Sequence, residues 1–183
     1  YSYKLRITNS FIFNRVLSIV TSMKNRIFIG EFIGSAFLVM IIVGSGIMAQ
    51  NLTRDFAVML LANTIATGAG LFVLINSIAN ISGAHFNPVV TMTMYFTKKI
   101  KKDLIFTYIS AQILGCLSGV MLANFMFDLP FIELSSKARP GFNIFIAEVI
   151  ATFGLIFIIF GSLKNGTVAV AASVATYITA GYW

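Results

Sequence analysis

The stretch that decides the fold lies near the middle of the chain and reads Ser82-Gly83-Ala84-His85-Phe86-Asn87-Pro88-Val89-Val90-Thr91. Asn87 and Pro88 together form a helix-start signal, because Asn is a favoured N-cap residue and Pro is tolerated at the first helical position. We therefore predict a short helix over 88–97. The lysines that follow within 98–102 suit the negative end of such a helix.

Long apolar runs lie on both sides of this stretch. Hydrophobic residues make up 58% of the 183 residues and charged residues only 10%, against about 25% charged residues in soluble domains. A soluble fold of this length could not bury so much apolar surface. A membrane-spanning helix needs about 20 mostly apolar residues. We therefore predict an all-α membrane protein with five full spans, at about 27–49, 56–78, 104–127, 143–163 and 166–183.

The segment 79–97 is predicted to enter the membrane and return to the same side. Segments rich in Lys and Arg favour the cytoplasm, so Lys24 and Arg26 place the start of the first span inside. Two spans bring the chain back inside near Asn80, and the lysine cluster at 98–102 belongs there too. The segment is then re-entrant, and 88–97 is a half-helix. Irregular backbone at membrane depth is tolerated where it lines a watery cavity or is buried in protein.

An internal repeat supports a channel or transporter architecture. Residues 30–46 (GEFIGSAFLVMIIVGSG) and 147–163 (AEVIATFGLIFIIFGSL) share seven of 17 positions without a gap, among them Glu31 and Glu148. The paired glutamates carry most of the weight, because a carboxylate inside a span is costly and rare. The first copy contains three full spans, and an odd number of spans makes the second copy run through the membrane in the opposite direction. We expect a first repeat at about 27–127 and a partial second repeat at about 143–183.

The stretch 82–91, with Gly30-Glu31-Phe32 at the start of the first span, resembles the first signature of the major intrinsic protein family, the aquaporins and aquaglyceroporins. The chain resembles bacterial members from about Met23 to Trp183. The resemblance implies an inverted-repeat bundle of six spans and two half-helices, each starting at an Asn-Pro pair. We expect 23–183 to be an incomplete channel domain that lacks the sixth span, the second half-helix and the filter arginine. Residues 1–22 are expected to be an extension outside the fold.

The resemblance also implies the parts of a pore. Asn87 of the signature Asn87-Pro88-Val89 would donate its amide N–H to a passing solute, although Val89 stands where the family usually has Ala. The residues before the signature would present backbone carbonyls along the pore, namely Gly83, Ala84 and His85. Family members place buried acids beneath such loops, where the acids accept backbone N–H bonds. Glu31 and Glu148 are expected to have this structural role.

The expected solute follows from two filter positions. Water-selective relatives narrow the pore with an aromatic residue in span two and a histidine in span five. The corresponding positions here are Thr67 and, in span five, Gly181, or Ala180 if the register slips by one residue. Small residues at both positions imply a wider filter. Glycerol-like solutes and neutral metalloid hydroxides, such as those of arsenic, are therefore expected to pass with water.

Other classes of protein have less support. An ion- or proton-coupled secondary transporter with inverted repeats stays open, with Glu31 and Glu148 as its available charges. The sequence holds no Ser/His/Asp set, phosphate loop or metal-binding cluster, so we predict no enzyme, no metal and no cofactor. The net charge is +7, and the Lys and Arg residues lie in short clusters between apolar runs. This arrangement favours a role in membrane topology over nucleic-acid binding.

The resemblance implies a homotetramer when the protein is full length, with the lipid bilayer, water and small neutral solutes as its partners. We expect a multi-pass protein of the bacterial inner membrane whose N-terminus is cytoplasmic.

Overall fold

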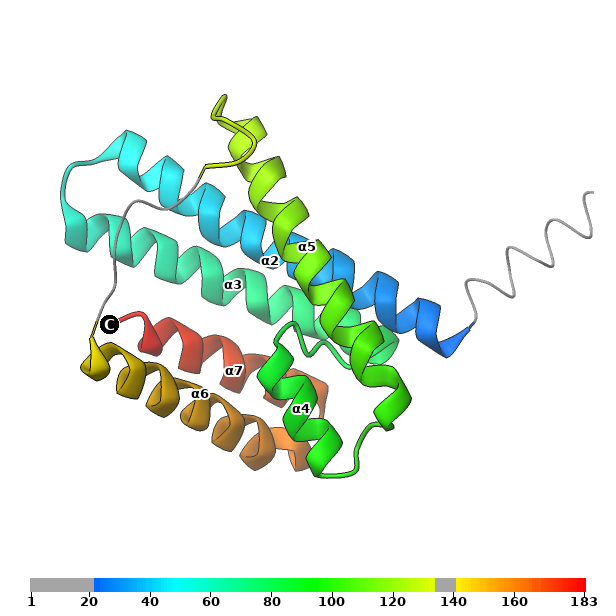
Figure 1. Ribbon diagram of the computed structural model, residues 1–183. Helices are drawn as coiled ribbons and strands as arrows, with labels where there is room; N and C mark the ends of the chain where they lie inside the picture. Colours follow the sequence, from blue (N-terminus) through cyan, green and yellow to red (C-terminus); the bar gives the residue numbers. More distant parts are fainter. Residues whose placement is uncertain (1–21, 134–140) are drawn as a thin grey trace, which may run out of the picture.

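The computed structural model describes residues 22–133 and 141–183, and within them the chain is helical with no strand (Figure 1). The helices are α2 (Met23–Leu52), α3 (Phe56–Ser82), α4 (Pro88–Phe96), α5 (Ile105–Met126), α6 (Phe142–Ser162) and α7 (Thr167–Gly181). Two short 3-10 turns, η1 (Lys102–Leu104) and η2 (Leu163–Asn165), precede α5 and follow α6. The predicted all-α fold is confirmed, whereas the expected extension 1–22 lies outside the described residues except for Ser22.

The helices agree with the predicted spans in number and order. In the described part of the chain, α2, α3, α5 with η1, and α6 with η2 are long and apolar enough to cross a membrane. The fifth predicted span is α7, an apolar helix of 15 residues. It is therefore shorter than the length of about 20 residues that a full span takes.

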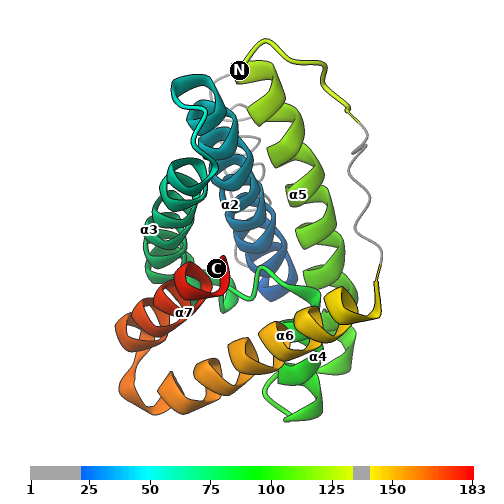
Figure 2. The same ribbon diagram turned by 90° about the vertical axis from the view of Figure 1, so that its left-hand side faces the viewer.

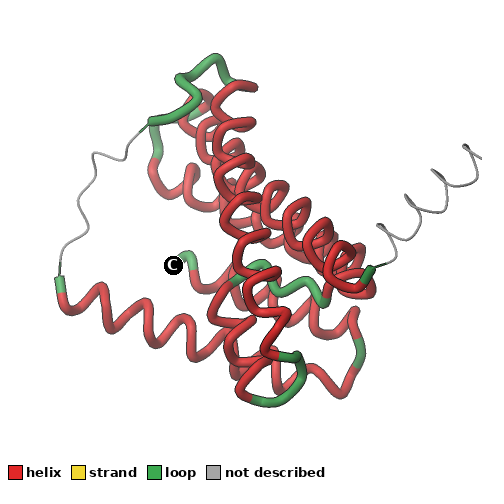
Figure 3. The backbone as a smooth tube through the Cα atoms, turned by 45° about the vertical axis from the view of Figure 1, so that its right-hand side comes forward, coloured by secondary structure: helices red, strands yellow, loops and turns green. Residues whose placement is uncertain are grey.

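The re-entrant segment has the predicted form. Helix α3 ends where Gly83 adopts a positive φ of 97°, a conformation that glycine reaches without steric cost. The chain then runs without helical structure to Asn87, and α4 begins at Pro88. This non-helical stretch lies inside the bundle, among the helices (Figure 3). The half-helix ends at Phe96, one residue earlier than predicted, and the lysines at 98–102 follow it.

The helices pack in the order that an inverted repeat requires. Helix α2 lies between α3 and α5, α3 packs against α7, and α7 packs against α6 (Figure 2). Two glycines of α5 allow the closest approach, because a Cβ at Gly115 or Gly119 would overlap the α2 backbone at Phe32 or Ala36. Figure 1 shows α2 and α6 running in opposite directions, as expected for helices that open the two copies.

Candidate functional site

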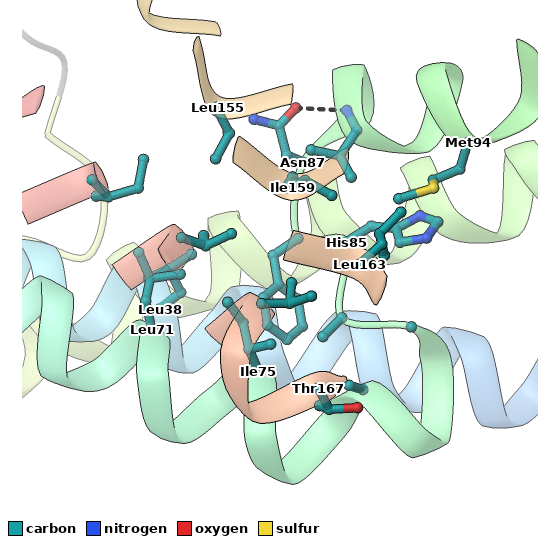
Figure 4. Close-up of a pocket in the computed structure, with 18 of the residues that line it drawn as sticks. Leu38, Leu71, Ile75, His85, Asn87, Met94, Leu155, Ile159, Leu163 and Thr167 are labelled. Atoms are coloured by element: carbon teal, nitrogen blue, oxygen red, sulfur yellow. Dashed lines mark hydrogen bonds between the residues drawn. The ribbon is translucent and has the colours of Figure 1, made fainter. Parts of the chain in front are cut away.

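A cavity of about 520 Å³ lies where the re-entrant loop meets the helices around it (Figure 4). Side chains of α2, α3, α4, α6 and α7 and the loop itself form its wall. Most of these side chains are apolar, among them Leu71, Ile75, Val90, Leu155 and Ile159. The polar part of the wall comes from Thr67, His85, Asn87, Thr167 and Tyr182. Within the described residues, the wall therefore holds no Asp, Glu, Lys or Arg.

The two polar atoms of the Asn87 amide face different surroundings, the oxygen facing α4 and the nitrogen facing the cavity. Its Oδ1 accepts hydrogen bonds from the backbone N–H groups of Val89 at 2.7 Å and Val90 at 3.4 Å, and so caps α4. Figure 4 shows the amide nitrogen turned the other way, toward the side of the cavity where Leu155 lies. The oxygen is held by the helix, and the N–H₂ group is left as a donor at the cavity wall.

Glu31 holds the non-helical loop from the side of α2. The carboxylate is fully buried (0% exposed) and accepts backbone N–H bonds from His85 at 3.0 Å and from Phe86 at 2.8 Å. It also accepts from Ser82 Oγ at 2.6 Å and from Gln112 Nε2 at 2.9 Å. Four donors satisfy a buried carboxylate that otherwise would be costly at membrane depth. This contact is the one that the resemblance implies for Glu31.

The same contacts orient the carbonyl groups of the loop. The peptide bonds of the described residues are trans, so each C=O points opposite to the N–H of the same peptide unit. The N–H groups of His85 and Phe86 face Glu31, and that of Ala84 faces Ser82 Oγ at 3.1 Å. The carbonyls of Ala84 and His85 therefore point away from Glu31, and the carbonyl of Gly83 points away from Ser82 Oγ. All three residues line the cavity.

His85 is fixed by a polar network. Its Nδ1 lies 3.1 Å from Thr91 Oγ1, and its ring stacks on Tyr108 with centroids 4.4 Å apart. Gln112 Nε2 donates to the same Thr91 oxygen at 3.0 Å, and the Tyr108 hydroxyl donates to the Ser82 carbonyl. In the described part of the chain, no group of His, Cys, Asp and Glu side chains could hold a metal ion.

The far end of the cavity differs from the predicted filter. Thr67 lines the cavity, but Gly181 and Ala180 are exposed and do not. Tyr182, which directly follows α7, lines it instead, with its hydroxyl 3.0 Å from Thr67 Oγ1. Counting residues along the sequence could not reveal this, because the rotation of α7 about its axis is set by its packing on α3 and α6.

Glu148 is exposed in the described part of the chain, so its expected structural role stays a prediction. It lies on an exposed face of α6, at the position that matches Glu31 in the repeat. Glu31 is covered by the loop 83–87 and by Gln112 of α5, whereas no described segment covers the corresponding face of α6. The helix alone does not bury the acid, because burial comes from the segments packed against it.

Several residues of this site escaped the sequence-based prediction. Tyr108, Gln112, Thr91 and Ser82 connect Glu31 with the loop, and all of them are buried. One signal was available for Gln112. An amide in the middle of an uncharged span is costly unless it is hydrogen-bonded, so it points to a partner within the bundle.

Comparison with known proteins agrees with this geometry. The sequence pattern of the Major intrinsic protein family matches residues 18–180. The chain is 43% identical over 155 residues to the aquaglyceroporin AqpS of Rhizobium meliloti, a match that covers 85% of this chain and 66% of AqpS. It is 31% identical over 156 residues to aquaporin TIP1-1 of Arabidopsis thaliana, covering 80% and 62%.

A solved structure shows the same fold. The aquaglyceroporin of Plasmodium falciparum superimposes with a TM-score of 0.73 at 23% identity, covering 86% of this chain and 71% of that one. The chain spans slightly less than two thirds of the length of AqpS and TIP1-1. The family match covers most of the chain and includes the re-entrant loop, the half-helix and the acid beneath them. The chain belongs to the major intrinsic protein family.

Proposed function

We propose that the protein is a passive transmembrane channel for water and small neutral solutes. This proposal rests on the amide group of Asn87, whose oxygen caps α4 while its nitrogen faces the cavity. A residue that only capped α4 would need an acceptor oxygen alone, and Asp or Ser would serve as well. Asn87 also supplies an N–H₂ donor at the wall of an apolar cavity. Such a donor suits a solute whose oxygen atoms can accept a hydrogen bond as the solute passes.

The electrostatics of the cavity favour neutral solutes. The N-terminus of a helix carries a partial positive charge, and α4 directs its N-terminus at the cavity through Asn87. A fixed positive end in an apolar channel repels cations. A coupled transporter needs charges that bind and release ions at its site. Glu31 lies behind the loop with four donors, and Glu148 is exposed on α6, so neither acid lines the cavity.

We propose that the carbonyl groups of Gly83, Ala84 and His85 accept hydrogen bonds along the pore. Their orientation away from Glu31 and Ser82 Oγ supports this role. A solute would exchange its water shell for these acceptors and for the Asn87 donor. The remaining wall is apolar and offers few competing contacts, so a solute that can both donate and accept is favoured.

The permeating class is proposed to include glycerol-like polyols and neutral metalloid hydroxides. Thr67 is smaller than an aromatic residue, and the name of the relative AqpS describes an aquaglyceroporin. Gly181 and Ala180 do not line the described cavity, so their place in the filter stays a prediction from the sequence. Tyr182 adds a hydroxyl at that level, beside Thr67.

The setting of the channel is also a proposal. Residues 23–183 would form the larger part of a six-span subunit, because the inverted repeat calls for a second half-helix after α7. The subunit is proposed to act as a homotetramer in a bacterial inner membrane. The positive-inside tendency supports a cytoplasmic N-terminus. The start of α2, which carries Lys24 and Arg26, and the turn after α4, which carries the lysines at 98–102, lie at one end of the bundle (Figure 1).

Stopped-flow light scattering on vesicles containing the native gene product tests the proposal. A sucrose gradient should shrink these vesicles faster than protein-free vesicles, and a glycerol gradient should be followed by faster reswelling. Asn87→Asp keeps an acceptor for the helix cap, removes the donor and adds a carboxylate at the positive end of α4, so it should fold normally and conduct less. Vesicles that behave like protein-free ones under both gradients would contradict a pore.

A further inference from the structure

A second cavity lies at the basic end of the bundle and shares no lining residue with the candidate pore. Its volume is about 570 Å³. It is formed by the start of α2, the end of α3 and the loop that leads into α5, three segments that meet at one end of the bundle (Figure 1). Its wall combines cationic and apolar side chains, namely Arg26, Lys99 and Lys101 with Met23, Ile27, Ile81, Ile100 and Leu104.

The cations of this cavity lack acidic partners in the described ranges. The nearby Asp103 is already paired with Lys24, at 3.5 Å. Arg26 donates through Nη2 to the carbonyl of Asn80 at 3.3 Å, which holds its guanidinium at the end of α3 with further N–H donors to spare. The Lys99 ammonium lies 5.9 Å from the centre of the Phe160 ring. Arg26 and Lys101 are therefore the two cations that remain for an anionic ligand.

The apolar part of the cavity selects the kind of anion. Ile27, Leu104 and Tyr108 form a buried cluster with Ile100 packed against it, and this cluster is the floor. Met23 and Ile81 are exposed at the rim (65% and 45%). A free phosphate would use the two cations and leave the apolar rim in contact with water. An amphiphile with an anionic head and an apolar tail would satisfy both.

We propose that this cavity binds an anionic phospholipid, with the phosphate between Arg26 and Lys101 and the start of an acyl chain against Met23 and Ile81. Basic pockets between helices, at the level where spans leave the membrane, are suited to anionic headgroups. The cavity lies where α2 begins and α3 ends, beside the lysines at 98–102, at the end of the bundle where these spans would leave the membrane. The proposal does not depend on whether the protein conducts.

The bound lipid is expected to stabilise the re-entrant loop. Ser82 and Tyr108 line this cavity and also belong to the contacts that hold the loop, since Tyr108 donates to the Ser82 carbonyl and Ser82 Oγ donates to Glu31. A ligand that binds only the folded state raises its stability. Phosphatidylglycerol should therefore raise the thermal midpoint more than phosphatidylcholine does.

Two double variants of equal charge change test the proposal. Arg26→Gln with Lys101→Gln removes the cavity cations, whereas Lys98→Gln with Lys102→Gln removes two cations of the same region that do not line it. Native mass spectrometry would follow phosphatidylglycerol and phosphatidylcholine binding to each detergent-purified chain. We expect the cavity variant to lose affinity for phosphatidylglycerol by about tenfold or more, and the control to change by about twofold at most.

Three outcomes would overturn the proposal. Equal losses in both double variants would mean diffuse attraction to surface charge. Displacement of the lipid by an equal concentration of inorganic phosphate would make the cavity a simple anion site. If a variant does not fold, a photoactivatable phosphatidylglycerol on the unaltered chain decides the matter: cross-links to peptides holding Met23 or Ile81 support the site, and cross-links only elsewhere refute it.

Discussion

Glu31 and Glu148 occupy matching positions of two similar helices, yet the first is fully buried and the second is exposed. Around Glu31, the loop 83–87 and Gln112 supply donors on two sides. Around Glu148, the described segments supply none. The difference teaches that the acid gains its structural role from the loop that folds onto it and not from its own helix.

The neighbours of the two acids make the same point. Gly30 and Gly34 precede and follow Glu31, and their counterparts beside Glu148 are Ala147 and Ala151. A Cβ at Gly30 would lie 2.9 Å from Ser82 Cβ, and one at Gly34 would overlap the ring of Phe86. Both glycines thus make room for the end of α3 and for the loop. On α6, the alanines have no loop to accommodate among the described residues.

The largest expected effect comes from the acids themselves. Glu31→Gln would place an amide N–H₂ against donors that now face a carboxylate, so the free energy of unfolding should fall by about 2–4 kcal/mol. Glu148→Gln, the matched control, should change it by about 0.5 kcal/mol or less, as at other exposed positions. Denaturant unfolding in detergent micelles measures both, and equal losses would remove the distinction between the two acids.

The next effect concerns the glycines of α2. Gly34→Ala would push a methyl group into the Phe86 ring, and overpacking of this kind costs about 1–3 kcal/mol. Gly161→Ala on α6 meets nothing within 4 Å and should be neutral or slightly stabilising. The thermal midpoints of the two variants should therefore move in opposite directions or differ clearly. A Gly34→Ala protein as stable as the unaltered one would show that the loop can shift freely.

A third effect tests the width of the pore where the two repeats meet. Thr67→Phe should reduce glycerol flux more than water flux and change the ratio of the two by roughly tenfold. Small differences in the size of a pocket discriminate between solutes by about this factor. Thr67→Val keeps the size and removes the hydroxyl that contacts Tyr182, so it should leave the ratio nearly unchanged. Stopped-flow measurements on the native gene product give both fluxes. Equal loss of water and glycerol flux in the Phe variant would rule out a wide filter.

The smallest expected effect concerns Asn87, for which we expect a change in water flux without a change in stability. Asn87→Asp keeps the cap on α4 and places its carboxylate at the positive end of that helix, so the free energy of unfolding should stay within about 0.5 kcal/mol. The replacement of the N–H₂ donor by a carboxylate oxygen should lower water flux by about threefold to tenfold. The combination of normal stability and reduced flux distinguishes Asn87 from Glu31, whose loss is expected to act on stability first. Unchanged flux in this variant would leave Asn87 as a cap alone.

Local patterns in the sequence were sufficient for much of the fold. Asn87 and Pro88 predict the start of α4, because capping involves only neighbouring residues. Uncharged runs predict the spans, and the re-entrant segment follows from the charges at its ends. Glu31 stands out as an acid within a span. Each of these signals is short-range, or is a matter of composition.

Contacts across helices could not be read in the same way. The hydrogen-bond partners of Glu31 include Ser82 and Gln112, which lie 51 and 81 residues away in the sequence. The exposure of Glu148 and the place of Tyr182 beside Thr67 depend on how α6 and α7 pack. A repeat in sequence predicts equivalent helices, but it does not predict equivalent surroundings.

The central claim is a passive pore for neutral solutes, and a test for coupling addresses it most directly. Vesicles containing the native gene product would be loaded with equal glycerol concentrations on both sides, and a pH gradient and a membrane potential would then be imposed. We expect no net glycerol movement, because no charged side chain lines the described cavity, and we expect rapid flux once a glycerol gradient is added. Uphill accumulation of glycerol driven by the pH gradient would contradict the claim and establish a coupled transporter.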